Sequence, residues 1–371
     1  MRPTHAEVDV DAITHNVAFV ADVVAPSRVC AVVKADGYGH GAVLAARAAL
    51  RGGASWLAVA LVEEATRLRE AQIDAPILLL SECRPEAMQR ARDLDLRMTL
   101  YSTDGIAAAA ATHGTTRWPV HLKIDTGMHR VGAAPREIVT RARAIDEAQE
   151  LELEALWTHC AVADDPKNAF TATQLDRFDA AAAALDAHGY RPSMLHAANS
   201  AVALLQPRGR YDMVRLGISM YGCPPASQHH ELARSLRPAL RLVSRVSHLQ
   251  VVAAGEGVSY GHRWRAEAAT TVATVPIGYE DGVRRDLGLL GGSVLIGGRR
   301  RRIIGVITMD QLMVDCGDAS VAVGDEVVVI GAQQDDTITA DEIADRLGTI
   351  SYEVLCNVGA RVPRYEVRAK S

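Results

Sequence analysis

The stretch AVVKADGYGHG, residues 31–41, decides the fold that this sequence predicts. The apolar run over residues 29–33 is typical of a strand buried in a parallel sheet. Lys34 stands at the carboxyl end of that run, and a glycine-rich turn separates it from an alanine-rich helix expected over residues 42–51. Apolar surroundings disfavour the ammonium form, so Lys34 would be a nucleophile able to form a Schiff base. A solvent-exposed lysine that simply ends a strand is the alternative.

The same alternation of short apolar strands and longer helices continues along the chain. Strands are expected at 29–33, 56–60, 77–80, 97–100, 120–124, 155–158, 194–196 and 213–216. The predicted helices include 11–25, 42–51, 63–71, 85–93, 135–147 and 173–187. About eight βα units are what a closed (β/α)8 barrel needs. An open doubly wound sheet is the alternative, and we prefer the barrel because no GxGxxG follows the first strand.

Near Pro238 the pattern changes to strands joined by glycine-rich turns. These strands are expected at 240–252, 270–276, 293–296, 302–307, 312–315 and 326–330. One helix is predicted over residues 339–347, with Thr339 as N-cap and Glu342 completing a capping box. The predicted fold class is therefore α/β + β: a TIM-type barrel over residues 1–236 and a mostly β domain over 237–371. Residues 1–10 could pair with the C-terminal domain.

Composition narrows the function classes. Of the 371 residues 49% are hydrophobic and 23% charged, with a net charge of −5, so neither nucleic acid nor an anionic membrane is an expected partner. No apolar run is long enough to span a bilayer, and the first residues do not resemble a signal peptide. The six cysteines are scattered without a CxxC pair, which favours buried thiols over disulfides or a zinc site. We expect a cytoplasmic enzyme without a metal.

Reactive side chains recur where barrel strands end, and barrels place their active sites at that edge. The residues at or just after these ends are Lys34, Lys123, Asp125, Arg130, His159, His196 and Ser200. Arg215 lies inside an apolar strand, where an arginine without a partner would be very costly. An ion pair with Asp212 is the purely structural interpretation of Arg215.

The stretch around Lys34 resembles the cofactor-lysine motif of the alanine racemases, and further motifs match that family in order over nearly the whole chain. They are LKIDTGMHRVG (122–132), THCAVAD (158–164), HAANSA (196–201), MVRLGISMYG (213–222), GVSYGH (257–262), PIGYEDG (276–282), TMDQ (308–311), ISYE (350–353) and RVPR (361–364). The resemblance implies the same barrel, the cofactor pyridoxal 5'-phosphate on Lys34, and a homodimer with shared active sites.

The resemblance also implies how the cofactor would be held. Arg215 would face the pyridine nitrogen; because arginine keeps its proton, the ring would be a weaker electron sink, which suits racemisation. His159 and His196 would join Arg215 in one hydrogen-bond network. The residues placed around the phosphate are Tyr38, Ser200, Gly217, Ile218 and Tyr352. For Ser200 alone, a helix N-cap is an equally good interpretation.

A racemase needs an acid or base on each face of a planar carbanion. By resemblance Lys34 serves one face and Tyr260, from the other subunit, serves the second. Arg130 and the backbone N–H of Met309 would bind the substrate carboxylate. The supporting residues would be Lys123, as a carbamate that holds Arg130, together with Asp310 and Tyr279. An ordinary strand tyrosine and an unmodified buried lysine are the alternatives for Tyr260 and Lys123.

Two residues depart from the family pattern. His129 replaces the small residue usual before Arg130, and Thr308 stands where many members have Cys or Ser. The sequence thus predicts a racemase acting on L- and D-alanine, and leaves open a serine-preferring or broad-specificity racemase of the same fold. A basic amino acid decarboxylase would be expected to have an acidic partner for the pyridine nitrogen, and a non-catalytic cofactor carrier would lack the domain that contains Tyr260.

Overall fold

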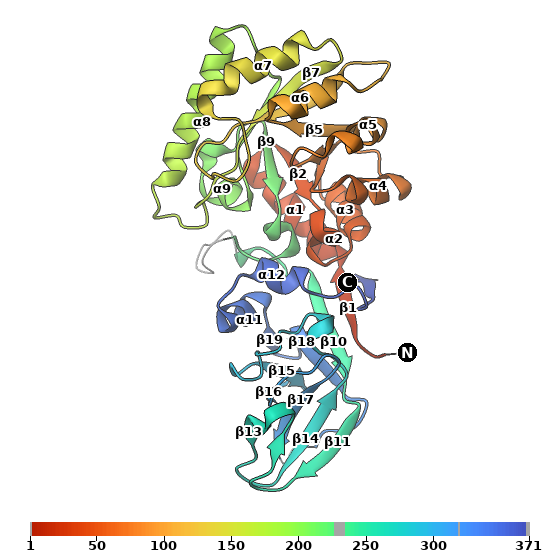
Figure 1. Cartoon of the computed structure of the whole chain (residues 1–371). Helices are drawn as coiled ribbons and strands as arrows, with labels where there is room; N and C mark the ends of the chain where they lie inside the picture. The colour runs from red at the N-terminus through yellow and green to blue at the C-terminus, as the bar shows by residue number, and fades with distance from the viewer. Residues whose placement is uncertain (1, 226–233, 318–319, 369–371) are drawn as a thin grey trace. The chain divides into compact units, whose positions relative to one another are not determined.

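The computed structural model describes residues 2–225, 234–317 and 320–368. The chain forms two compact units, which we describe separately (Figure 1). The first unit comprises residues 1–12, 38–41 and 238–371, and the second comprises residues 13–37 and 42–237. We call them the β unit and the barrel unit. The segment from Tyr38 to Gly41, inside the stretch that opens the sequence analysis, belongs to the β unit.

The barrel unit is built on eight parallel strands, which confirms the predicted barrel. Their order is β8-β7-β6-β5-β4-β3-β2-β9. The strands are β2 (Arg28–Val32), β3 (Trp56–Val59), β4 (Ile77–Leu79), β5 (Leu96–Leu100), β6 (Trp118–Lys123), β7 (Leu151–Trp157), β8 (Met194–His196) and β9 (Met213–Leu216). All residues of β3, β4 and β9 are buried, as apolar runs in a parallel sheet require.

The two end strands of this sheet, β8 and β9, meet at a seam held by a few hydrogen bonds. The N–H of Asp212 donates to the carbonyl of Leu195, and the N–H of Arg215 donates to that of Ala198, both at 3.0 Å. The Asp212 carboxylate accepts a further bond from the Leu195 N–H at 2.7 Å. Asp212 thus serves the seam, and the structural interpretation that pairs it with Arg215 is wrong.

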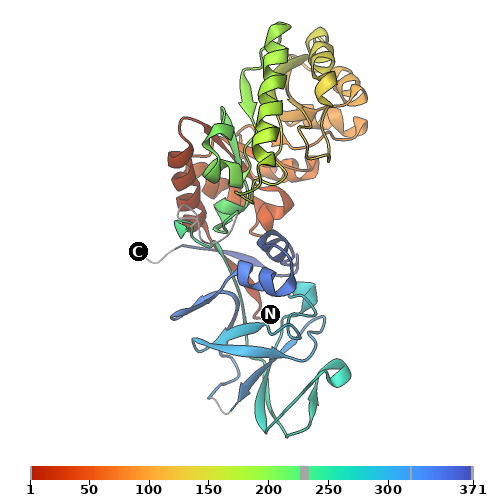
Figure 2. The same ribbon diagram turned by 90° about the vertical axis from the view of Figure 1, so that its left-hand side faces the viewer.

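Helices follow the strands and flank the barrel (Figures 1 and 2). They are α3 (Ala42–Arg51), α4 (Val62–Glu70), α5 (Pro85–Asp93), α6 (Thr103–Ala110), α7 (Ile138–Glu147), α8 (Phe170–Ala187) and α9 (Ser200–Leu205), preceded by α1 (Val10–Val24). Short 3-10 turns occur at η1 (Pro135–Glu137), η2 (Pro207–Gly209) and η3 (Ile218–Tyr221). Within the described residues, no helix is long and apolar enough to cross a bilayer.

One predicted strand is longer than expected. β7 begins at Leu151 rather than at residue 155, because the LELE sequence at its start, although partly exposed, still pairs with β6. The pairing shifts register there: Val120 is opposite Leu153 and His121 is opposite Ala155. Glu154 is therefore the extra residue of a β-bulge, a feature that re-aims a side chain.

The short helical turn α2 (Lys34–Tyr38) is left-handed. Ala35, Asp36 and Gly37 all have φ between 51° and 64°, and Tyr38 has φ 52°. Such a conformation costs roughly 1–2 kcal/mol for each L-residue with a side chain, so the surroundings must hold it. Glu64 of α4 does so: its carboxylate accepts the N–H groups of Ala35 at 2.6 Å and of Ala60 at 2.8 Å.

The β unit contains a ten-stranded sheet with a mostly antiparallel path, β11-β14-β17-β16-β15-β18-β10-β1-β20, and β19 pairs with β18. β1 (His5–Asp9) lies between β10, antiparallel to it, and β20, parallel to it. The other strands are β10 (Leu240–Arg245), β11 (His248–Val252), β14 (Thr270–Val275), β15 (Ser293–Ile296), β16 (Arg299–Ile304), β17 (Leu312–Gly317), β18 (Glu326–Gln333), β19 (Asp336–Ile338) and β20 (Arg364–Val367). A separate hairpin joins β12 (Gly257–Val258) to β13 (Trp264–Arg265).

Several predictions for this unit need correction. The strand expected over 240–252 is two strands, because β10 pairs with β1 and β18 whereas β11 pairs with β14. Thr339 does cap α11 (Ala340–Leu347) by accepting the Glu342 N–H at 3.0 Å. The reciprocal half of the predicted capping box is not found, because the Glu342 carboxylate binds Arg300 at 2.6 Å instead. The helix α12 (Ser351–Cys356) was not predicted.

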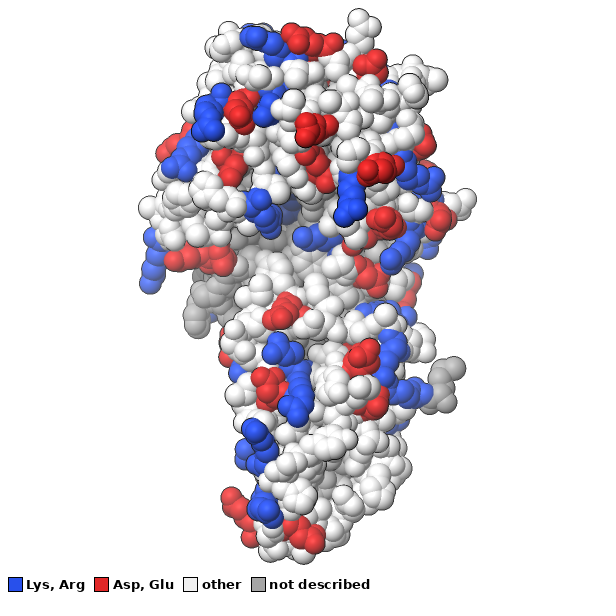
Figure 3. Space-filling model, in the orientation of Figure 1, with Lys and Arg blue, Asp and Glu red and all other residues white. Residues whose placement is uncertain are grey.

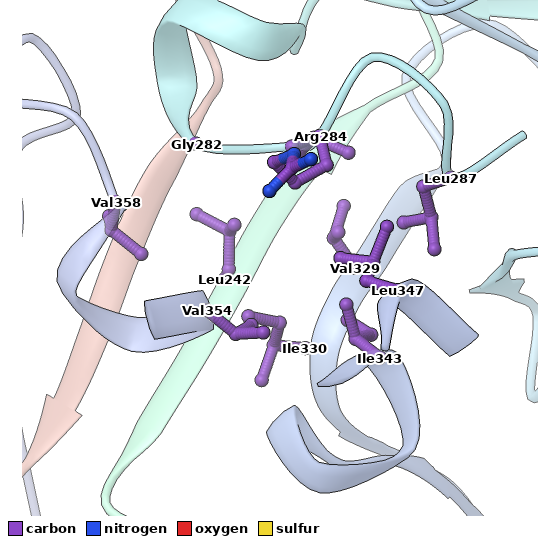
Figure 4. Close-up of a pocket in the computed structure, with 11 residues that line it drawn as sticks. Leu242, Gly282, Arg284, Leu287, Val329, Ile330, Ile343, Leu347, Val354 and Val358 are labelled. Carbon is purple, nitrogen blue, oxygen red and sulfur yellow. The ribbon is translucent and has the colours of Figure 1, made fainter. Parts of the chain in front are cut away.

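The apolar side chains of α11 and α12 pack onto β10 and β18 around a small cavity (Figure 4). Its volume of about 20 Å³ admits roughly one water molecule, so it is a packing gap rather than a ligand site. On the face drawn in Figure 3, acidic and basic side chains are interspersed over both units.

Candidate active site

The centre of the candidate site is one layer of side chains from neighbouring barrel strands. Register pairs Lys123 of β6 with Trp157 of β7, Trp157 with His196 of β8, and Cys30 of β2 with Arg215 of β9. All five are buried. They share a level near the carboxyl ends of their strands, where barrels place their reactive groups.

Both terminal nitrogens of the Arg215 guanidinium are engaged by neighbouring groups. One terminal nitrogen contacts His196 Nδ1 at 2.8 Å, and the other contacts His159 Nδ1 at 3.2 Å. It also donates to the carbonyl oxygens of Thr158 at 2.8 Å and Ala197 at 3.0 Å, and it lies 4.6 Å from the centre of the Trp157 ring. Burial lowers the pKa of Arg215 to about 10, which still leaves it a cation at neutral pH.

A chain of hydrogen bonds extends from Arg215 through two buried histidines. His196 Nε2 lies 3.1 Å from His121 Nδ1, and His121 Nε2 lies 2.9 Å from a carboxylate oxygen of Glu154. Arginine only donates and a carboxylate only accepts, so the direction of every bond is set. His196 accepts at Nδ1 and donates from Nε2, and His121 does the same. Both rings are therefore the same neutral tautomer.

The ionisation of the chain agrees with that assignment. Burial lowers the pKa of His121, and burial together with the Arg215 charge holds the pKa of His196 well below its ordinary value. Burial alone would raise the pKa of Glu154, but the bond from His121 and the charge of Arg97 outweigh it and lower the pKa. Because arginine does not release its proton, this chain holds groups in place and does not conduct protons.

Lys123 has an unusual environment for a lysine. Its Nζ lies 4.3 Å from the centre of the Trp157 ring, and the residue is 3% exposed. Burial, reinforced by the positive charges of Arg215, Arg130 and Lys34, lowers its pKa to about 7. Near neutral pH this lysine therefore has a neutral amine available as a nucleophile, which an ordinary lysine does not.

Arg130 lies in the exposed loop after β6, and the residue before it adopts a left-handed conformation. His129 has φ 54°, and its Nδ1 contacts the Asp125 carboxylate at 3.2 Å. Asp125 also accepts the N–H groups of Gly127 and His129. Histidine is one of the side chains that tolerate this conformation.

Lys34 lies two residues after the end of β2 and is part-buried. Within β2, burial raises the pKa of the Cys30 thiol to about 12, so that thiol stays protonated. At the ends of β8 and β9, the hydroxyl of Ser200 accepts a hydrogen bond from the Gly217 N–H at 3.0 Å. Ile218 then begins the 3-10 turn η3. This is the edge at which barrels usually bind phosphate.

Two of the predicted cofactor residues lie together in the β unit. The rings of Tyr38 and Tyr352 are 6.0 Å apart between centres and tilted by 48°. Tyr38 is buried, and burial raises its pKa, so it remains a neutral phenol that can donate. The backbone beside it approaches α12 closely: a Cβ on Gly39, whose φ is +81°, would lie 2.2 Å from the Leu355 carbonyl oxygen.

Tyr260 begins the 3-10 turn η4 (Tyr260–His262), which is flanked by strained backbone. Ser259, Gly261 and His262 all have positive φ, and the Ser259 hydroxyl anchors the turn on the Val306 carbonyl at 2.6 Å. The Tyr260 side chain is 71% exposed. It lines a cavity of about 900 Å³, with Val251, Thr308 and Met313 among its other walls.

Tyr279, Met309 and Asp310 also come together in the β unit. The 3-10 turn η5 (Tyr279–Asp281) packs against the loop over residues 308–311. The N–H of Tyr279 donates to the Thr308 carbonyl at 3.0 Å, and the N–H of Glu280 donates to that of Met309 at 3.2 Å. Gly278 permits this approach, since a Cβ there would lie 2.3 Å from the Thr308 oxygen.

Sequence reasoning missed His121, Glu154 and Trp157. His121 and Lys123 are two residues apart on one strand and so face the same side, a signal that the VHLK sequence did contain. Trp157 is likewise two residues before the predicted strand-end His159. No sequence signal marked Glu154, because the direction in which its side chain points depends on the β-bulge in β7.

The sequence and the fold of this chain both match one family of known proteins. The alanine racemase N-terminal domain model matches residues 8–225, and the alanine racemase C-terminal domain model matches residues 239–366. Alanine racemase from Symbiobacterium thermophilum is 45% identical over 368 residues, covering 98% of this chain and 97% of the relative. The crystal structure of alanine racemase from E. faecalis has a TM-score of 0.93 at 38% identity, covering 99% of this chain and 98% of that one. The Bacillus anthracis alanine racemase with bound L-Ala-P has a TM-score of 0.94 at 36% identity, covering 100% and 96%.

Proposed function

Since the chain belongs to the alanine racemase family, we propose that it interconverts L-alanine and D-alanine with pyridoxal 5'-phosphate as its cofactor. Its product would supply peptidoglycan synthesis, or the reaction would run in D-alanine catabolism. The observation that carries this proposal is the buried Arg215 in the barrel layer, whose two terminal nitrogens are held by neighbouring groups.

The side chains present suit the cofactor. Arg215 is a permanent donor for a pyridine nitrogen, and its hydrogen bonds to the neutral His196 and His159 hold it in place. Ser200, Gly217 and Ile218 would bind the phosphate at the end of β8 and β9, and Tyr38 and Tyr352 would donate their hydroxyls. When bound, the cofactor stabilises negative charge at the substrate Cα, and Lys34 would hold it covalently.

Two residues would move the proton at Cα. The amine of Lys34 would remove or return the proton on one face. Tyr260 would do the same on the opposite face, so the stereochemistry depends on which residue returns the proton. Arg215 would favour reprotonation at Cα, because a cation that keeps its own proton would leave the ring nitrogen of the cofactor unprotonated.

Arg130 and the backbone N–H of Met309 would bind the substrate carboxylate, with Asp310 and Tyr279 supporting. Lys123 would be carbamylated: its neutral amine attacks the carbon of CO2, an N–C bond forms as one C=O π pair moves onto oxygen, and the proton lost from nitrogen passes to water. Because the pKa of Lys123 is lowered to about 7, its neutral amine is available near neutral pH. The surrounding positive charges of Arg215, Arg130 and Lys34 disfavour the ammonium form of Lys123. The same charges would stabilise the negative charge of its carbamate.

We further propose a homodimer in which each site combines Lys34 of one chain with Tyr260 of the partner subunit. Support comes from the exposure of the groups concerned in the single chain: Tyr260 is 71% exposed and Met309 is 50% exposed. Val251, on the wall of the same cavity as Tyr260, is 75% exposed. A two-fold partner would cover such a surface.

We also propose that the enzyme acts in the cytoplasm. All six cysteines lie in described ranges, and none forms a disulfide, which suits a reducing compartment.

Chiral analysis tests the function. The purified enzyme with added cofactor is incubated separately with L-alanine, L-serine and L-lysine. We expect the largest kcat/KM for L-alanine, because the rings of Tyr279 and Tyr352 would crowd a larger side chain. An equal or larger value for serine would favour the broad-specificity alternative, and loss of CO2 from lysine would favour the decarboxylase.

A further inference from the structure

The carboxylate of Asp281 holds two arginines from distant parts of the chain. The side chain of Asp281 is fully buried. Arg2 binds both of its oxygens at 2.8 Å. Arg361 binds them at 2.8 and 3.3 Å, and the Gly278 N–H adds a bond at 2.8 Å. Burial alone would raise the pKa of Asp281, but these bonds outweigh burial and lower it, so the group is an anion.

The same two arginines reach the loop over residues 308–311. Arg361 contacts the Asp310 carboxylate at 2.8 Å and donates to the Met309 carbonyl at 3.2 Å. Arg2 donates to the Asp310 carbonyl at 3.3 Å and to that of Pro276 at 2.7 Å. One buried charge is thus connected, through two planar cations, to two successive peptide groups of this loop.

The position of the loop determines where the Met309 N–H points. The Thr308 carbonyl and the Met309 N–H belong to one planar, trans peptide group and point in opposite directions. Because the Thr308 carbonyl accepts the Tyr279 N–H, the Met309 N–H is directed away from η5. The arginines fix the next two carbonyls, which keeps that peptide plane from rotating.

We propose that Arg2, Asp281 and Arg361 are positioning residues that aim the Met309 N–H at the substrate carboxylate. This inference rests on the proposed function and deepens it, because none of the three residues touches the substrate. A purely structural role would lower stability in general. A positioning role instead weakens substrate binding through this one loop.

The test uses Arg2→Gln, which leaves Asp281 with its bonds from Arg361 and Gly278. We expect KM for L-alanine to rise about tenfold while kcat changes less than about twofold. Arg2→Lys should recover part of the lost substrate affinity, since lysine keeps the positive charge but not the two parallel N–H donors of the guanidinium. Arg300→Gln is the matched control: the Arg300 side chain is 37% exposed against 38% for Arg2 and is likewise paired with carboxylates, but it lies on β16 and its partners are Asp336 and Glu342.

Hydrogen exchange gives a second readout that needs no turnover. In Arg2→Gln the amides of Tyr279, Glu280 and Thr308 should exchange about tenfold faster than in the parent enzyme, and in Arg300→Gln they should not. Unchanged exchange in Arg2→Gln, or equal effects of both variants, would overturn the inference. If the parent enzyme fails to racemise alanine, the proposed function fails, whereas the exchange result still decides whether Arg2 holds the loop.

Discussion

The two sets of candidate groups are built in opposite ways. In the barrel unit, Arg215, His196 and Lys123 are buried, and each is held by neighbouring side chains. In the β unit, Tyr260 and Met309 are exposed and are held through the backbone of short turns. The candidate groups of the barrel unit are therefore fixed by contacts within that unit, whereas those of the β unit would, in the proposed homodimer, act against the partner subunit.

Removing Lys34 should have the largest effect. Lys34→Ala deletes both the covalent attachment and one proton-transfer group, so we expect racemisation to fall by about 10⁴-fold or more. After borohydride treatment, mass spectrometry should find the cofactor on the peptide that contains Lys34 in the parent enzyme only. The exposed Lys167→Ala serves as control. Retained borohydride-stable attachment in the Lys34 variant would contradict the assignment.

Mixing inactive subunits tests most directly whether the buried groups of one barrel unit work with the exposed groups of the partner's β unit. Lys34→Ala and Tyr260→Phe are each expected to be nearly inactive. If sites are shared, a mixed dimer has one site with both changes and one with neither. Random exchange of equal amounts should then restore about a quarter of the parental sites. Mass spectrometry of the intact dimers checks that exchange occurred; mixed dimers without recovered activity would place Lys34 and Tyr260 of one chain in the same site.

A smaller effect is expected at the far end of the histidine chain. Glu154→Gln replaces an acceptor-only group by one that can also donate, so the tautomers of His121 and His196 are no longer set at that end. We expect kcat to fall about tenfold, the worth of one hydrogen bond to a charged group. Glu152→Gln, exposed on the same strand, is the control.

Nitrogen-15 spectra of the histidines provide the decisive readout for that chain. The parent enzyme should show His121 and His196 as neutral rings protonated at Nε2, and Glu154→Gln should show a mixture. A charged ring, or protonation at Nδ1 in the parent enzyme, would refute the assignment whatever the kinetics.

The smallest effect concerns stability and pH in CO2-free buffer. Lys123 keeps its proton up to about pH 7 in the folded chain but up to about 10.5 when unfolded. Between these values the unfolded state binds more protons, so the free energy of unfolding should rise by about 1 kcal/mol per pH unit. Urea titrations of the parent and of Lys123→Met check this. Bicarbonate should flatten the dependence in the parent, and an identical slope in both proteins would exclude Lys123 as its source.

The sequence predicted the barrel well because buried parallel strands are short apolar runs, a pattern that single sequences display clearly. It predicted the start of β7 and the split between β10 and β11 poorly, because partner strands decide both. His121 was available from alternation on β6. Asp281 was not, since its partners Arg2 and Arg361 are far away in sequence and only the folded chain joins them.

The left-handed turn after Lys34 has a consequence for the chirality of the chain itself. Residues 35–37 have the backbone angles that mirror an ordinary helix, and these angles are favourable for D-amino acids. A semisynthetic enzyme with D-alanine at position 35 should therefore relieve strain that the natural L-alanine bears. D-alanine, the proposed product of the reaction, is thus the form of alanine that suits the backbone of the enzyme at position 35.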